Sequence, residues 1–261
     1  MICNLYLPVM IAIMGAMPQE VEGLVAAMQN IEVKEAGMRT YYKGVLFGQQ
    51  AVVVFSRWGK VAAATTALHL LHQYPVQQLI FTGVAGAIHQ KLNIGDVVIG
   101  HKLYQHDMDA RPLMQQFEIP LLGKTFFETD STHRQTAFDS AAKLLAENTL
   151  LEAISPQQLT QYNIASPQAY MGDIASGDKF FNTTAHKNEL VQYLPQVLCV
   201  EMEGAAVAQV CYEYGLPFSI VRIISDVADD NSHIDFPSFV TNVASQYSVA
   251  IIKEIFSHQS A

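Results

Sequence analysis

A chain of 261 residues, half of them apolar and only 15 % charged, can bury one sizeable core and is too poor in charge for a long disordered segment. Fifteen lysines and arginines against 24 aspartates and glutamates give a formal net charge of −9, and no basic run is present, which argues against nucleic acid as a partner. Three irregularly spaced cysteines provide neither a disulfide framework nor a zinc site, and no apolar run reaches the roughly 18 residues of a membrane span. We therefore expect a cytoplasmic protein.

The first half of the chain alternates apolar runs with helical patterns. Residues 1–9 are expected to be a leader outside the core, because Met10 offers an alternative start inside the strand-like run VMIAIMGA. The pattern predicts strands over 9–16, 51–59 and 78–82, and helices over 18–31 and 60–74. The strand at 78–82 ends in the small-residue run TGVAG, and a further apolar run follows at 94–107.

The second half repeats this arrangement after a less regular region at 103–130, which is rich in aromatic residues and predicts a long loop or hairpin. We expect helices over 131–148 and 183–194, from about 203, and over 236–258, with strands near 197–200 and 218–224.

The valine and isoleucine runs lack polar alternation, which is typical of strands buried on both faces of a sheet. We therefore predict an α/β fold with three layers: a central mixed, mainly parallel, twisted sheet flanked by helices. Residues 10–258 form one domain in this interpretation, because no linker or repeat divides them.

Polar side chains or small residues stand at four predicted strand ends, where α/β sheets bind their ligands. These ends carry Met17 and Glu20, the run TGVAG, Glu201 and Glu203, and Ser225 and Asp226. Several carboxylates with little lysine or arginine nearby in sequence suit a sugar whose ring becomes positively charged when its base departs.

Seven motifs occur in order along residues 10–253: GAMPQEV, GKVAAA, TGVAGA, IGDVV, SGDKF, VEMEGAAVAQVC and RIISDVADDNSHIDF. Their order and spacing resemble those of the 5'-methylthioadenosine/S-adenosylhomocysteine nucleosidases, in the nucleoside phosphorylase and nucleosidase superfamily. The resemblance implies a nucleoside phosphorylase-like fold, a role in methionine salvage, and hydrolysis of the N-glycosidic bond that releases adenine and a 5-substituted ribose. It requires no cofactor or metal.

The resemblance assigns the two catalytic roles by position. Asp226 matches the general acid that protonates N7 of adenine, and Ser225 matches its orienting partner. At the end of an apolar strand, Asp226 is expected to have a pKa raised by desolvation. Glu20 matches the residue that positions and deprotonates the attacking water.

The remaining matches describe the substrate pocket. Glu203 would hold the ribose hydroxyls, Met202 would lie against the sugar, and Glu201 would be an outer partner whose carboxylate is satisfied when hydroxyls arrive. The other expected contacts are the purine-stacking Phe180, the backbone of Phe181 at the adenine edge, the closely approaching Val84, Ala85 and Gly86, and the 5' walls Met17 and Phe236. The ring of Trp58 is expected to narrow or cover the pocket.

Two departures from the family pattern leave alternatives open. Arg57 stands where these hydrolases usually have glycine, so a phosphorylase that recruits phosphate is one alternative. The segment 103–125 differs from its counterparts, so a nucleosidase for another purine nucleoside such as 6-amino-6-deoxyfutalosine is a second. A catalytically silent nucleoside-binding protein is a third. The resemblance also implies a homodimer, with 103–125 near the neighbouring site.

Overall fold

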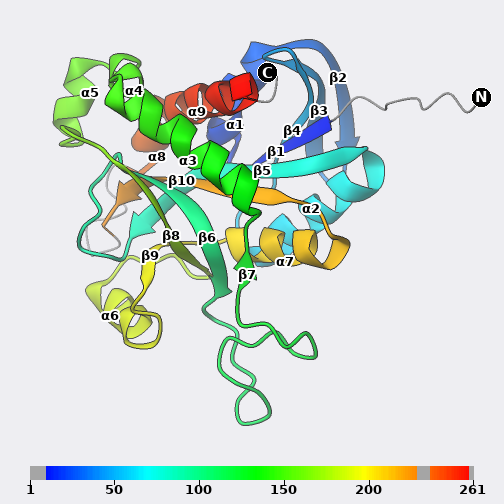
Figure 1. Ribbon diagram of the computed structural model, residues 1–261, viewed down its shortest axis with the longest axis vertical. Helices are drawn as coiled ribbons and strands as arrows, with labels where there is room; N and C mark the ends of the chain where they lie inside the picture. The colour runs from blue at the N-terminus through cyan, green and yellow to red at the C-terminus, as the bar shows by residue number, and fades with distance from the viewer. Residues whose placement is uncertain (1–9, 228–235, 259–261) are drawn as a thin grey trace, which may run out of the picture.

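The computed structural model describes residues 10–227 and 236–258, so the expected leader at 1–9 lies outside the described residues. Strands and helices follow one another along the chain (Figure 1). The strands are β1 Met10–Gly15, β2 Met28–Ala36, β3 Arg39–Leu46, β4 Gln49–Phe55, β5 Val76–Ala87, β6 Val97–Gln105, β7 Phe127–Glu128, β8 Ala169–Ser176, β9 Val197–Glu201 and β10 Phe218–Asp226. The helices are α1 Pro18–Ala27, α2 Lys60–Gln73, α3 Ser131–Ala146, α4 Thr149–Glu152, α5 Pro156–Gln161, α6 Thr184–Tyr193, α7 Gly204–Tyr214, α8 Phe236–Phe239, the π-helical turn η1 Val240–Ala244 and α9 Ser245–His258.

The strands form one mixed sheet in the order β10-β6-β8-β9-β5-β1-β4-β3-β2, with β7 paired to β6. Because β5 also pairs with β10, the strands β5, β10, β6, β8 and β9 close into a ring. Half of the ten described pairs are parallel, and they join β1 to β4 and β5, β5 to β10, and β8 to β6 and β9. The carboxyl ends of β1, β5 and β10 therefore meet at one edge.

Helices cover both faces of the sheet, with α2 and α7 packed together on one face and α1, α3 and α9 on the other (Figure 1). Strand β1 shows how the sequence produces this layering. Its residues Met10, Ala12 and Met14 belong to the core beneath α2 and α7, whereas Ile11 and Ile13 belong to the core beneath α1 and α9. All six residues of the strand are buried. The expected three-layer α/β fold is confirmed.

Several predicted boundaries are wrong. The first helix ends at Ala27 instead of continuing to residue 31, because Met28 pairs with Leu46 and begins the hairpin of β2 and β3. The strand predicted at 78–82 continues to Ala87, so TGVAG lies within β5 rather than beyond it. The predicted closing helix is interrupted by η1, and the sequence patterns indicated neither α4, α5 nor β8.

The irregular region at 103–130 is partly a strand. Residues 103–105 complete β6, and Phe127–Glu128 returns as β7, which pairs with β6. The intervening residues 106–126 form the long loop that extends from the bottom of Figure 1. Leu113 and Leu121 in this loop are 87 % and 95 % exposed.

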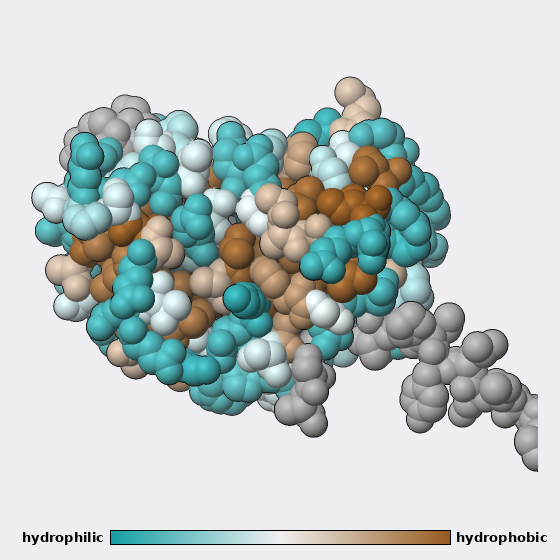
Figure 2. Space-filling model, turned by 90° about the horizontal axis from the view of Figure 1, so that it is seen from above, coloured by the Kyte–Doolittle hydropathy of each residue, from teal (hydrophilic) through white to brown (hydrophobic). Residues whose placement is uncertain are grey.

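Figure 2 views the molecule from above, from the side of α4, α5 and α9, and shows apolar side chains in the middle bordered by hydrophilic ones. Some apolar exposure of this kind is usual, because a large part of any folded surface is apolar. Within residues 10–227 and 236–258, no helix combines the length and the hydropathy that crossing a membrane would require.

Candidate active site

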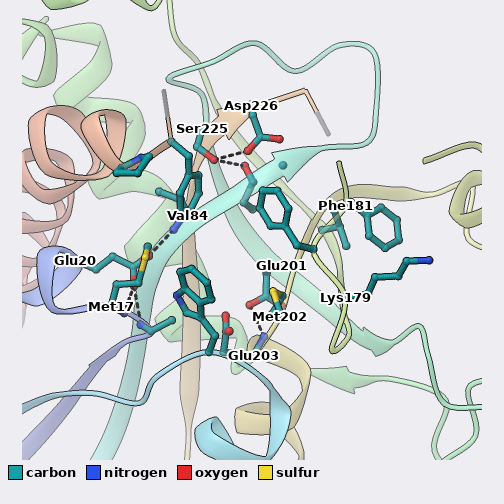
Figure 3. Close-up of a pocket in the computed structure, with 18 residues that line it drawn as sticks. Met17, Glu20, Val84, Lys179, Phe181, Glu201, Met202, Glu203, Ser225 and Asp226 are labelled. Atoms are coloured by element: carbon teal, nitrogen blue, oxygen red, sulfur yellow. Dashed lines mark hydrogen bonds between the residues drawn. The ribbon is translucent and has the colours of Figure 1, made fainter. Parts of the chain in front are cut away.

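A cavity of about 400 Å³ lies at the sheet edge where β1, β5 and β10 end (Figure 3). All fourteen residues predicted for the site line it: Met17, Glu20, Trp58, Val84, Ala85, Gly86, Phe180, Phe181, Glu201, Met202, Glu203, Ser225, Asp226 and Phe236. The sequence analysis did not name four further lining residues, Ala16, Lys179, Val200 and Pro237. Each of these is adjacent in the chain to a named one, which was the available signal.

Glu20 is held at the start of α1 by backbone N–H groups from the turn between β1 and α1 and from β5. Its Oε2 accepts hydrogen bonds from Ala16 N (2.6 Å) and Met17 N (3.0 Å), and its Oε1 accepts one from Val84 N on β5 (3.1 Å). The side chain is buried, and burial raises the pKa of the Glu20 carboxyl, although Arg222 and the three N–H groups act in the opposite direction. The carboxylate is therefore fixed in orientation and more basic than an exposed one.

Arg222 is a central charge of the site that the sequence analysis missed. It lies in the middle of β10, is 1 % exposed, and its Nη2 contacts Glu201 Oε2 at 2.6 Å. Its guanidinium also stacks over the Phe81 ring at 4.1 Å from the centroid. A single arginine inside the apolar run FSIVRII was the available signal, because a buried cation needs a partner.

Glu201 is fully engaged within the protein. Besides Arg222, its carboxylate accepts hydrogen bonds from Glu203 N, from Gly204 N (2.8 Å) and from the hydroxyl of Ser176. The expectation that its carboxylate is satisfied only when hydroxyls arrive is therefore wrong. The Glu201 carboxylate fixes the position of Arg222 and binds the first backbone N–H groups of α7.

Within the described residues, the Glu203 carboxyl group differs from that of Glu201 in accepting a single hydrogen bond, which Gly59 N donates to its Oε1 at 2.8 Å. The side chain is buried, and burial together with the neighbouring Glu201 raises the pKa of Glu203 from 4.5 to about 8. Its other carboxyl oxygen is the position at which a ligand hydroxyl can be held.

Asp226 ends β10 and is oriented by its chain neighbour, as the sequence predicted. The Ser225 hydroxyl donates to Asp226 Oδ2 at 2.7 Å, and both residues are 8 % exposed. Figure 3 shows Asp226 at the top of the cavity, Glu20 at its left and Glu203 at the bottom. The acids thus surround one space instead of opening onto separate surfaces.

Aromatic side chains form the remaining walls. Phe180 is 41 % exposed and meets Phe236 edge to face, with ring centroids 6.0 Å apart. Phe181 is buried between the rings of His106 (5.1 Å) and His186 (5.6 Å). Trp58 is 61 % exposed at the mouth of the cavity. The arrangement combines flat apolar walls, suited to a heterocycle, with carboxyl groups suited to a sugar.

Arg57 does not line this cavity. It lines an adjoining cavity of about 480 Å³, and its Nη2 donates to the carbonyl oxygen of Gly37 at 3.4 Å. The described residues bring together no group of three histidine, cysteine or acidic side chains that could bind a metal ion.

Comparison with known sequences agrees with this geometry. The sequence model of the phosphorylase superfamily matches residues 10–257. The chain is 32 % identical over 249 residues to the 5'-methylthioadenosine/S-adenosylhomocysteine nucleosidase of Bacillus cytotoxicus, covering 94 % of this chain and 99 % of the relative. It is 33 % identical over 244 residues to the nucleosidase of the same name from Bacillus cereus, covering 93 % and 96 %.

Solved structures of nucleosidases and of a related hydrolase are also similar to this chain. The crystal structure of the Neisseria meningitidis nucleosidase of that name, in complex with methylthio-immucillin-A, has a TM-score of 0.81 at 30 % identity and covers 95 % of this chain and 99 % of its own. The futalosine hydrolase of Helicobacter pylori has a TM-score of 0.80 at 28 % identity, with coverage of 96 % and 98 %.

The fold and the site define a member of the phosphorylase superfamily. Within that superfamily, the chain belongs to the family of the 5'-methylthioadenosine/S-adenosylhomocysteine nucleosidases, which confirms the resemblance of its motifs.

Proposed function

We propose that this protein hydrolyses the N-glycosidic bond of 5'-methylthioadenosine, S-adenosylhomocysteine or both, and releases adenine and a 5-substituted ribose. One observation carries the proposal: Asp226 and Glu20, more than 200 positions apart in sequence, line the same cavity with Glu203. We propose these two substrates because the similar proteins are named as nucleosidases of both.

The proposed reaction begins at the base. As the bond between C1' of ribose and N9 of adenine breaks, its electron pair moves into the purine, and Asp226 transfers its carboxyl proton to N7. The ribose ring takes on oxocarbenium character, which the carboxylates around the cavity stabilise. Glu203 holds the ribose hydroxyls, and Phe180 stacks on the purine.

Water then completes the reaction. Glu20 accepts a proton from a water molecule as the water oxygen attacks C1', so one proton leaves Asp226 and one arrives at Glu20 in each turnover. The three N–H groups that bind Glu20 support the role of an oriented base. Phosphate as nucleophile is disfavoured, because Arg57 lines the adjoining cavity and not this one.

The test is adenine release in phosphate-free buffer by the wild-type protein and by Asp226→Asn. We expect adenine from the wild type, and a kcat roughly 100- to 10,000-fold lower in the variant, because asparagine accepts the Ser225 hydrogen bond but has no proton to give. Asp139→Asn, on the exposed side of α3, is the matched control and retains full activity. Release that depends on phosphate, or an unimpaired Asp226→Asn, contradicts the proposal.

A futalosine-type nucleoside is the second candidate substrate, and the Helicobacter pylori futalosine hydrolase supports it with a TM-score nearly equal to that of the Neisseria nucleosidase. Values of kcat/KM measured side by side on 5'-methylthioadenosine, S-adenosylhomocysteine and 6-amino-6-deoxyfutalosine rank the two candidates. The highest value identifies the better substrate.

We further propose a homodimer in the cytoplasm in which the segment 103–125 lies near the neighbouring subunit's site. Two leucines in this segment, Leu113 and Leu121, are almost fully exposed, and burying them against a second copy is favourable.

A further inference from the structure

The carboxyl group of Glu203, which holds the ribose in the proposed reaction, is oriented by a backbone group from a distant part of the chain. Gly59 N donates to Glu203 Oε1 at 2.8 Å, and Gly59 directly precedes Lys60, the first residue of α2. Within the described residues, this is the single hydrogen bond that the Glu203 carboxyl group accepts. The position of Gly59 therefore decides how Glu203 presents its other oxygen to the cavity.

Asp178 binds the next backbone N–H group along the chain. Its Oδ1 accepts a hydrogen bond from Lys60 N at 2.7 Å, so Glu203 and Asp178 bind two consecutive N–H groups where α2 begins. Negative charge is favourable at this end of a helix. Gly59 has no side chain to cap α2, and a Cβ at this position would lie 3.0 Å from Asp178 Oδ1. The glycine thus lets a carboxylate from another segment take the role of a capping side chain.

Two further interactions close these groups into a ring. Lys60 Nζ contacts Asp107 Oδ1 at 2.6 Å, and Asp107 Oδ2 accepts a hydrogen bond from Asp178 N at 2.9 Å. Gln105 Oε1 also accepts from Lys60 Nζ, at 3.2 Å. Burial would raise the pKa of the Asp107 carboxyl, but the hydrogen bonds from Lys60 and from Asp178 N lower it, so this acid is charged at neutral pH. Asp178 is thus held at both its backbone and its side chain.

Asp178 also lies beside the wall of the cavity that is suited to a heterocycle. It directly precedes the lining residues Lys179, Phe180 and Phe181. Its bond to Lys60 N joins the motifs SGDKF and GKVAAA, 118 positions apart in sequence. One residue therefore connects the segment that carries the aromatic wall to the helix start that orients Glu203.

We infer that Asp178 is a positioning residue that fixes Glu203 against the ribose hydroxyls. Its side chain holds Lys60 N, which keeps Gly59 N in place to orient the Glu203 carboxyl. Asp178 does not line the cavity, so it acts through Glu203 and not by touching the substrate. The inference rests on the proposed nucleosidase function and adds a residue to its ribose site. A residue that only stabilised α2 would change the amount of folded protein, but not the preference for a substrate with ribose hydroxyls.

The experiment compares 5'-methylthioadenosine with its 2',3'-dideoxy analogue, which lacks both ribose hydroxyls. The ratio of the two kcat/KM values, hydroxylated over dideoxy, is measured on one preparation, so that any loss of folded protein cancels. We expect Asp178→Ala to lower this ratio about three- to tenfold from its wild-type value, because a displaced carboxyl loses part of its hydrogen bonding to the hydroxyls. Asp178→Asn keeps an acceptor for Lys60 N and retains most of the ratio.

Glu203→Ala and Asp139→Ala complete the set of variants. Glu203→Ala removes the carboxyl group, so its ratio is lower still, and adding Asp178→Ala to it changes the ratio no further. Asp139→Ala removes an exposed aspartate that accepts a hydrogen bond on α3 outside both cavities, and it leaves the ratio at its wild-type value.

An unchanged ratio in Asp178→Ala or in Glu203→Ala overturns the inference, as does an undiminished effect of Asp178→Ala in the double variant. Wild-type protein that releases adenine from neither nucleoside contradicts the nucleosidase function itself.

Discussion

Arg222 controls the charge balance of the site. It is buried among Glu201, Glu203 and Glu20; burial by itself would lower the pKa of its guanidinium, but these three carboxyl groups raise it instead. Because Arg222 forms an ion pair with Glu201, it adds no net positive charge beside the space where a sugar cation would form. This residue was not predicted, because the local signal, a lone arginine in an apolar run, does not identify its partners, which depend on the strand ends that lie around it in space.

Glu203 makes stability depend on pH. The unfolded carboxyl releases its proton near pH 4.5, whereas the folded one retains it up to about pH 8. Between these values the folded state binds more protons, so the free energy of unfolding falls as pH rises, by at most about 1.4 kcal/mol per pH unit. We expect Glu203→Gln to lack this loss, so that wild type becomes progressively less stable relative to the variant from pH 5 to pH 8. Urea unfolding at each pH measures the difference.

Glu147→Gln is the control for this measurement, because it makes the same change of side chain at an exposed position after α3, outside the cavity. If the difference in unfolding free energy between wild type and Glu203→Gln stays constant from pH 5 to pH 8, the buried Glu203 carboxyl does not hold its proton.

The pairing of β5 with β10 determines how closely the charged groups approach one another. In this parallel pair Arg222 lies opposite Gly83, and a Cβ on Gly83 would lie 2.7 Å from Glu20 Oε1 and 3.0 Å from Arg222 Nη1. The absence of a side chain at Gly83 is therefore what lets Glu20 and Arg222 come together. The small residues of TGVAG were predicted to let a ligand approach the backbone closely. At Gly83 the groups that approach the backbone are instead the side chains of Glu20 and Arg222.

Gly83→Ala tests this packing. We expect a loss of about 1–3 kcal/mol of unfolding free energy from overpacking, together with lower kcat/KM, because the methyl group displaces Glu20. Urea unfolding and adenine release measure the two effects. Gly48→Ala is the control: its φ of 85° makes alanine strained, but no atom lies within 4 Å of the new Cβ, so activity is retained. Full activity in Gly83→Ala contradicts the role given to this glycine.

Elements with strong apolar patterns were predictable, and several elements without such a pattern were not. Strands β1, β4, β9 and β10 and helices α2, α3 and α7 occur where the runs of buried residues place them. Strand β2 was missed because its residues are largely exposed and polar and its identity as a strand comes from pairing with β3. The same pairing ends α1 early. Helices α4 and α5 span four and six residues, too short to show a helical period.

At the scale of the whole molecule, the loop at 106–126 supplies the test of assembly. We expect the protein to have the mass of a dimer by light scattering, and Leu113→Asp combined with Leu121→Asp to shift it toward the monomer and raise KM, since charged residues replace apolar contacts. Val33→Asp, on exposed β2 at the opposite end of Figure 1, leaves the mass unchanged. A monomeric wild type, or a double variant that stays dimeric, contradicts the proposed interface.

The distribution of the site along the chain has a practical consequence. Because Glu20 and the N–H of Val84 precede the loop at 106–126, whereas Glu203 and Asp226 follow it, a cut in that loop would leave each fragment with an incomplete set of groups. The two halves recover a whole site only when β5 and β10 pair again. Adenine release would then serve as a direct reporter of fragment complementation.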